Sequence, residues 1–169
     1  MALTSLKETD FISEDSDDDR ETALDAVRHN GMILKLLLPK IRADRYVVHE
    51  AVKQHGMALR HAAATLRADP RVVLAAVKQC GYALEFAAEE LCANPEVVIE
   101  AVTQSGRSLE HSSEQVRANR RVVLAAVRRS GTSLEFAAEH LRADREVVLA
   151  AVQSCGYALM FVAEELRVE

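Results

Sequence analysis

Several features that commonly mark an enzyme, a membrane protein or a secreted protein are scarce in this 169-residue chain. It has no tryptophan, 4% aromatic residues, three prolines and three cysteines. No apolar run approaches the roughly 18 residues that a membrane span needs, and the N-terminus lacks the basic and apolar regions of a signal peptide. Cys80, Cys92 and Cys155 show neither pairing nor metal-ligand spacing. We therefore expect no membrane association and an intracellular, cytoplasmic location, where thiols stay reduced.

Glycine is scarce too, but its six occurrences are evenly spaced along the chain. They are Gly31, Gly56, Gly81, Gly106, Gly131 and Gly156, each 25 residues from the next. A fixed period in this range is typical of repeat proteins. It divides the chain into six units, 19–43, 44–68, 69–93, 94–118, 119–143 and 144–168.

The unit 69–93 shows the pattern of one repeat. Asp69 is a favourable N-cap residue, and an apolar stripe at helical spacing follows it, ending at Cys80. Gly81 comes directly after this stripe, so we predict that it ends the first helix in a left-handed conformation. A second stripe begins at Leu84 and predicts a second helix. Residues equivalent to Asp69 are Asp19, Asp44, Asn94, Asn119 and Asp144.

Each predicted helix is near ten residues, which is too short to be stable alone in water. The apolar face of a unit must therefore be covered by its neighbours, as in a solenoid. We predict an all-α fold, a short α-solenoid of six 25-residue helix-turn-helix repeats. The pattern leaves open whether the superhelix is right-handed or left-handed.

The N-terminal part of the chain departs from the repeat. Residues 1–18 have no periodicity, and we predict that they form a disordered acidic tail. The formal charge of −5 belongs to this region, since the rest of the chain is nearly neutral. The second helix of the first unit is rich in leucine, so its leucines either fold inward or are covered by something else. Pro39 is expected to kink or end that helix.

With the unit written out, the segments DREVVLAAV, G-Y-A-L, F-x-A-E-E-L and R-A-D resemble the repeat family known as domain of unknown function 4116. The resemblance covers residues 19–168, and spacing and residue types agree through five or six copies. It implies a tandem helical-repeat protein. It implies no activity, cofactor or binding residue.

Residues that could carry out chemistry do not gather in the sequence. His61 and His111 share a repeat position but are two units apart, roughly 20 Å if each unit adds one helix diameter, so they form no metal site. Each glycine stands alone, which excludes a phosphate-binding loop. Glu135 and Glu139 lie on a solvated helix face rather than in an acid–base pair. We predict that the protein is not an enzyme and has no metal or cofactor.

Charged residues also recur at fixed positions. An arginine near the end of most units, as at Arg117, favours the negative end of a helix dipole, and a glutamate such as Glu114 lies three residues before it. Residues Arg71, Glu96, Arg121 and Glu146 alternate in sign and predict ion pairs between neighbouring units. Because the array is nearly neutral, we expect nucleic-acid binding to be disfavoured.

The most variable positions lie on one stripe of the second helices, four residues apart within each unit. Aromatic residues there need either a neighbouring unit or a partner. Both interpretations stay open: packing between successive helices, or a recognition surface. The ten candidate partner-binding residues, called the variable stripe below, are Met57, His61, Tyr82, Phe86, Arg107, His111, Thr132, Phe136, Tyr157 and Phe161.

We expect a non-catalytic protein–protein interaction scaffold with a protein partner. The alternative is nucleic-acid or small-ligand binding on the variable stripe. The last unit keeps the apolar pattern of an internal unit, with Leu159 and Leu166 on its core stripe, instead of the polar residues usual in a capping unit. Its end is therefore expected to dock onto another copy in end-to-end self-association, onto a further array, or onto a partner.

Overall fold

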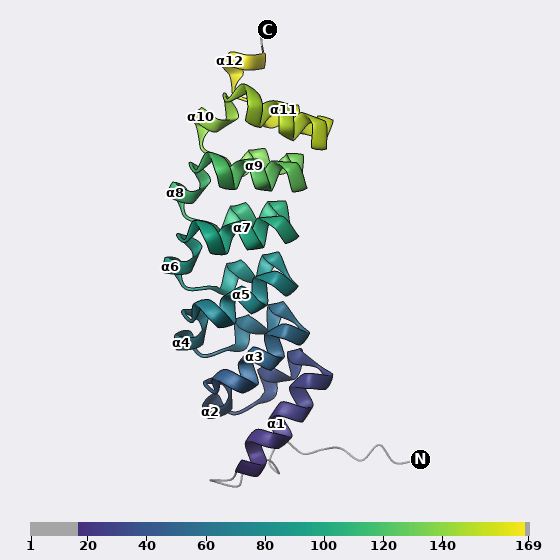
Figure 1. The fold of residues 1–169 in the computed structure, drawn as a ribbon, viewed down its shortest axis with the longest axis vertical. Helices are drawn as coiled ribbons and strands as arrows, with labels where there is room; N and C mark the ends of the chain where they lie inside the picture. Colours follow the sequence, from purple (N-terminus) through teal and green to yellow (C-terminus); the bar gives the residue numbers. More distant parts are fainter. Residues whose placement is uncertain (1–16, 168–169) are drawn as a thin grey trace, which may run out of the picture.

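The computed structural model describes residues 17–167 as one stack of repeated units (Figure 1). Each unit contains a first α-helix, a six-residue 3₁₀ helix and a four-residue α-helix. No strand occurs within the described range, so the predicted all-α solenoid is confirmed. The first helices are α1 (Asp17–His29), α3 (Arg45–Gln54), α5 (Pro70–Gln79), α7 (Pro95–Gln104), α9 (Arg120–Arg129) and α11 (Arg145–Ser154). The 3₁₀ helices are η1 (Gly31–Leu36), η2 (Gly56–His61), η3 (Gly81–Phe86), η4 (Gly106–His111), η5 (Gly131–Phe136) and η6 (Gly156–Phe161). The short helices are α2 (Pro39–Arg42), α4 (Ala64–Arg67), α6 (Glu89–Cys92), α8 (Glu114–Arg117), α10 (Glu139–Arg142) and α12 (Glu164–Arg167).

The predicted N-caps begin the first helices of units two to six. In α5, for example, the Asp69 carboxylate accepts a 2.9 Å hydrogen bond from the Arg71 amide. The first unit differs, because α1 begins at Asp17 and Asp19 lies inside the helix rather than at its cap. Of the predicted tail, residues 1–16 are outside the described range, and residues 17 and 18 begin α1.

The predicted second helix is divided in two in every unit. In unit three, Ala87 and Ala88 are extended between η3 and α6, and the Ala88 amide donates to the Arg67 carbonyl of the preceding unit at 2.9 Å. An amide that bonds to a neighbouring unit cannot donate within its own helix, so the helix is interrupted there. Pro39 fits this break as the first residue of α2, where its missing amide is harmless. Equivalent hydrogen bonds join Ala63 to Arg42, Ser113 to Cys92, Ala138 to Arg117, and Ala163 to Arg142.

The core runs the length of the stack between the first helices and the 3₁₀ helices. Each first helix packs against the next one, and each 3₁₀ helix does the same. A leucine from each of the first five 3₁₀ helices is fully buried. The side chains with the least exposure include Leu34, Leu59, Leu84, Leu109, Leu134, Val47, Val48, Val72 and Val73. Neighbouring units therefore cover one another's apolar faces, as the short helices require.

The prediction that the glycines end the first helices in a left-handed conformation is wrong. None of the six has a φ angle in the left-handed region, and each begins a 3₁₀ helix instead of ending the helix before it. A Cβ atom on Gly81 would overlap the Ala101 carbonyl oxygen in the next unit. Glycine is therefore needed because two backbones approach closely. The same contact joins Gly31 to Ala51, Gly56 to Ala76, Gly106 to Ala126, and Gly131 to Ala151.

Only some of the apolar residues in the leucine-rich part of the first unit pack inward against the core. Leu34 and Ile41 are buried, and Leu37 is half-buried. Leu36 is 74% exposed and Leu38 is partly exposed. Inward packing therefore accounts for some of these residues, while Leu36 points away from the core.

Candidate functional site

All ten residues of the variable stripe lie on the 3₁₀ helices, and several of them contact the neighbouring unit. The rings of Tyr82 and His111 meet edge to face with centroids 6.4 Å apart. The guanidinium of Arg107 lies 4.9 Å from the centroid of the Phe136 ring. In both cases the first stripe residue of one unit contacts the second stripe residue of the next. The stripe is therefore a seam along the stack and does not converge on one pocket.

Other contacts add to this seam. Arg60 lies over the Phe86 ring, 5.6 Å from its centroid, and Arg107 approaches Glu135 at 3.6 Å. Phe86, Phe136 and Phe161 also pack against the core. Packing between units thus occupies part of the stripe. Met57 and Thr132 are half-buried, whereas Tyr157 is 58% exposed and stacks against Phe161 within η6.

Within the variable stripe, the surroundings of His61 lower its pKa. Burial disfavours its charged form and lowers its pKa, and the nearby cations Arg60, Lys35 and Arg42 lower it further. Its Nε2 atom is buried without a hydrogen-bond partner. Across residues 17–167 no group of three metal-ligating side chains forms around it or elsewhere.

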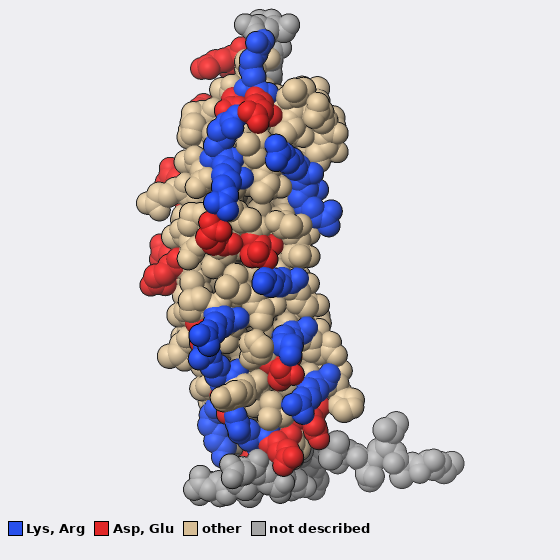
Figure 2. All heavy atoms as spheres, in the orientation of Figure 1, with Lys and Arg blue, Asp and Glu red and all other residues tan. Residues whose placement is uncertain are grey.

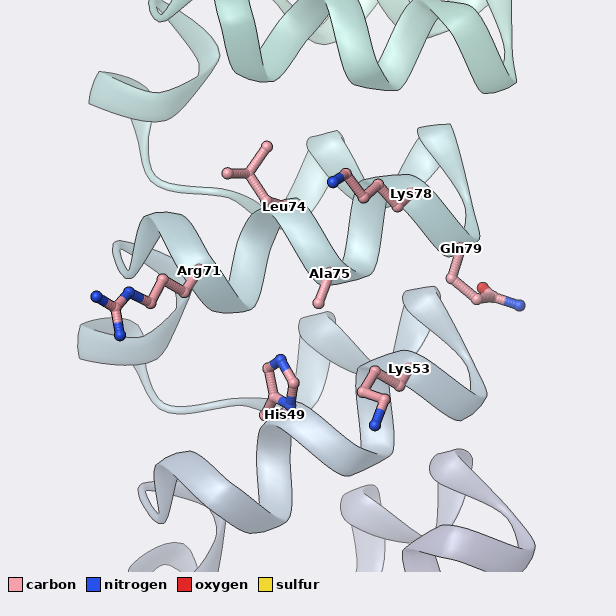
Figure 3. Close-up of a pocket in the computed structure, with 7 residues that line it drawn as sticks. All are labelled: His49, Lys53, Arg71, Leu74, Ala75, Lys78 and Gln79. Atoms are coloured by element: carbon pink, nitrogen blue, oxygen red, sulfur yellow. The ribbon is translucent and has the colours of Figure 1, made fainter.

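A groove on the other side of the stack was not predicted from the sequence. It lies between α3 and α5, has a volume of about 650 Å³, and is shown in Figure 3. Leu74 and Ala75 provide its apolar surface, and Ala75 and His49 point toward one another across it. The remaining lining residues are Lys53, Arg71, Lys78 and Gln79. Comparing the exposed positions of the first helices, instead of only the second helices, could have found this basic cluster.

The basic residues of this groove differ from those of α9 in their pairing. Arg120 bonds to Asp144 at 2.9 Å and also to Glu146, and Arg121 pairs with Glu96 at 3.1 Å. Arg120 thereby lowers the pKa of the Asp144 carboxyl. In Figure 2, acidic side chains near the middle of the stack separate basic side chains on either side of them. The two acidic residues of α7 are Glu96 and Glu100.

Arg71 and Lys78 have no acidic partner within 4.0 Å among the described residues, although Lys53 bonds to Glu50 at 2.9 Å. The predicted pair between Arg71 and Glu96 is therefore not formed. These two cations are available to an external anion.

The recurring arginines contribute through their backbone. Each ends a short helix, and the carbonyls of Arg42, Arg67, Arg117 and Arg142 accept the inter-unit hydrogen bonds described above. Cys92 takes the same place in unit three, so this bond does not depend on the side chain. The predicted ion pair between Glu114 and Arg117 is absent from the described structure within 4.0 Å, as is the one between Glu139 and Arg142.

The described part of the chain contains no helix that combines the length and the apolar character needed to cross a membrane. Its three cysteines are free thiols. Burial raises the pKa of the Cys92 thiol, with a further contribution from Glu89.

Comparison with known proteins identifies the repeat. The family model described as Domain of unknown function (DUF4116) matches four times in tandem, at residues 19–67, 44–91, 69–117 and 119–167. Searches of curated proteins and of solved structures found no match. The tandem matches span almost all of the described residues and follow the same 25-residue period as the helices. The chain therefore belongs to the family Domain of unknown function (DUF4116).

Proposed function

We propose that this chain is a non-catalytic scaffold that binds a protein partner in the groove between α3 and α5. The partner segment is acidic and extended, and it carries an apolar side chain. One observation carries the proposal: Leu74 and Ala75 form an apolar surface beside Arg71 and Lys78, which have no acidic partner in the described structure.

The chemistry of the groove selects this kind of segment. An apolar side chain can cover Leu74, which is half-buried, and gain about 25 cal/mol for each Å² of apolar surface removed from water. Carboxylates on either side can then pair with Arg71 and Lys78. Charge pairs of this kind contribute mainly to specificity and to the rate of association.

The acidic residues of α7 favour a protein segment over a nucleic acid. Glu96 is exposed and Glu100 is half-buried on the unit next to the groove. A phosphate backbone running along the stack from α5 would meet these carboxylates after one unit. A peptide confined to the groove would avoid them.

The 3₁₀-helix seam is less suited to this role. Its aromatic rings at Phe86 and Phe136 already contact arginines of the preceding unit. A partner on the seam would compete with these contacts, whereas the groove offers side chains that are free of such pairing.

Fluorescence anisotropy with a labelled peptide tests this proposal. The probe carries leucine and phenylalanine among aspartates and glutamates, and its control replaces the acids by asparagine and glutamine. We expect binding of the acidic peptide alone, and a loss of affinity of about tenfold or more when Arg71→Glu and Lys78→Glu are combined. Arg128→Glu is the matched control, because Arg128 occupies the repeat position of Lys78 two units further along.

Any of three results would overturn the proposal. The first is equal affinity for the acidic and the neutral peptide, and the second is equal affinity of the double variant and the unchanged chain. The third is tighter binding of a labelled single-stranded DNA, with the steep salt dependence that phosphate contacts produce. This third result would support the nucleic-acid alternative.

We also infer that the protein acts in the cytoplasm. Its three cysteines are free thiols, which is usual in a reducing compartment. Fluorescence microscopy of the tagged protein in its source cell tests this location.

A further inference from the structure

The last described unit exposes a surface that, in each of the other five units, packs against the next unit; this packing contact is called the joint below. A Cβ atom on any of the first five glycines would meet the carbonyl oxygen of an alanine in the next first helix. A Cβ atom on Gly156 would have no described atom within 4 Å. Leu159 is 57% exposed, although the equivalent leucines of the five preceding units are fully buried. Tyr157 and Met160 lie beside it and are also more than half exposed.

The first unit presents the opposite half of such a joint. Leu36 occupies the second stripe position, at which His111 and Phe136 contact the 3₁₀ helix of the preceding unit. In unit one this side chain is 74% exposed. On α1, Thr22 is exposed and Ala26 is half-buried, whereas the equivalent Val47 and Ala51 of α3 are fully buried.

We propose that the C-terminal unit of one molecule binds the N-terminal unit of a second copy, head to tail, in the geometry of the internal joints. The Ala26 carbonyl of the second copy would lie against Gly156, as the Ala151 carbonyl lies against Gly131. Leu36 of the second copy would cover Tyr157 and Met160. The proposed contact thus covers exposed apolar side chains of both end units, Leu36 of the first and Tyr157 and Met160 of the last.

Charge supports the same pairing. An arginine at the start of a first helix bonds to the cap aspartate of the next unit, as in Arg45 to Asp69 at 2.7 Å and Arg120 to Asp144 at 2.9 Å. Arg145 and Asp19 are the equivalent residues at the two ends of the stack. Within its own unit, the Asp19 Oδ2 atom already lies 3.7 Å from the Lys40 Nζ atom. In the head-to-tail joint, Arg145 of one copy would lie beside the ion pair between Asp19 and Lys40 of the next.

The two halves lie at opposite ends of the stack (Figure 1), so one molecule cannot join its own ends within this fold. A heterologous contact of this kind extends into an open chain unless rotation closes it into a ring. The expected assembly therefore grows beyond a dimer as concentration rises.

Sedimentation velocity with end-specific variants tests the joint. Gly156→Val blocks the C-terminal half, and Leu36→Glu blocks the N-terminal half; both sites are exposed, so neither change disturbs the core. We expect the unchanged chain to form species larger than dimers, each variant alone to stay monomeric, and an equimolar mixture of the two to form a dimer that grows no further. Thr103→Glu, at an exposed position of α7, is the control and should assemble like the unchanged chain.

Other outcomes would overturn the proposal. If Leu36→Glu still dimerises and Gly156→Val does not, two C-terminal ends face each other instead. A strictly monomeric unchanged chain at high micromolar concentration would exclude the joint. Circular dichroism checks that each variant is folded, and Tyr157→Glu serves as a second C-terminal variant if Gly156→Val loses helical signal.

Discussion

Replacing Gly106 by alanine should destabilise the stack through a contact with the next unit. The added Cβ would overlap the Ala126 carbonyl oxygen and lie 2.8 Å from the Ser133 Oγ atom. The Ser133 hydroxyl can rotate, but the Ala126 carbonyl belongs to α9 and can move only if the two units separate slightly. Overpacking of this kind costs about 1–3 kcal/mol. Reduced entropy of the unfolded chain offsets about 0.4–1 kcal/mol, which leaves a net loss of about 1–2 kcal/mol.

Gly156→Ala is the matched control, because it changes the same repeat position where no described atom lies within 4 Å. It should leave stability unchanged or raise it by up to about 1 kcal/mol. Urea unfolding followed by circular dichroism, at a protein concentration where the chain is monomeric, measures both variants. Equal destabilisation by the two substitutions would refute the reasoning, since a local backbone requirement would then explain the glycines better than contact between units.

Three further predictions concern charge and the N-terminal segment. His61→Phe, which copies Phe86, should raise the free energy of unfolding by about 1 kcal/mol, because it removes a buried unpartnered nitrogen. Folding lowers the pKa of His61 below its ordinary value of 6.5, so the unchanged chain should lose stability as the pH falls below 6.5. Urea titrations between pH 7 and 5 should show a weaker loss of stability in His61→Phe. Arg120→Gln should raise the pKa of Asp144 toward 3.8 in an NMR titration; the stability difference from the unchanged chain should be present above that pH and disappear in more acidic solution. Deleting residues 1–16 should leave the urea midpoint unchanged, because their composition offers little apolar surface to pack, and a lowered midpoint would show that they contribute to the fold.

The sequence by itself determined the repeat, the class of fold and the starts of the first helices in units two to six. Apolar spacing within ten residues reports which side of a helix is buried, and a cap such as Asp69 bonds to amides only two or three residues away. These interactions are local, so residue order is enough to predict them. The short length of each helix then requires neighbours, which predicts a stack.

The tertiary structure decided how the units meet. The reason for Gly81, the break at Ala87 and Ala88, and the contact between Tyr82 and His111 all involve atoms of adjacent units. The variable stripe was found from the sequence, but the sequence left open whether it packs between successive helices or forms a recognition surface. The groove at Arg71 was missed because its two walls come from different units. Distances across such joints depend on how closely two backbones pack, and a 25-residue period carries no measure of that separation.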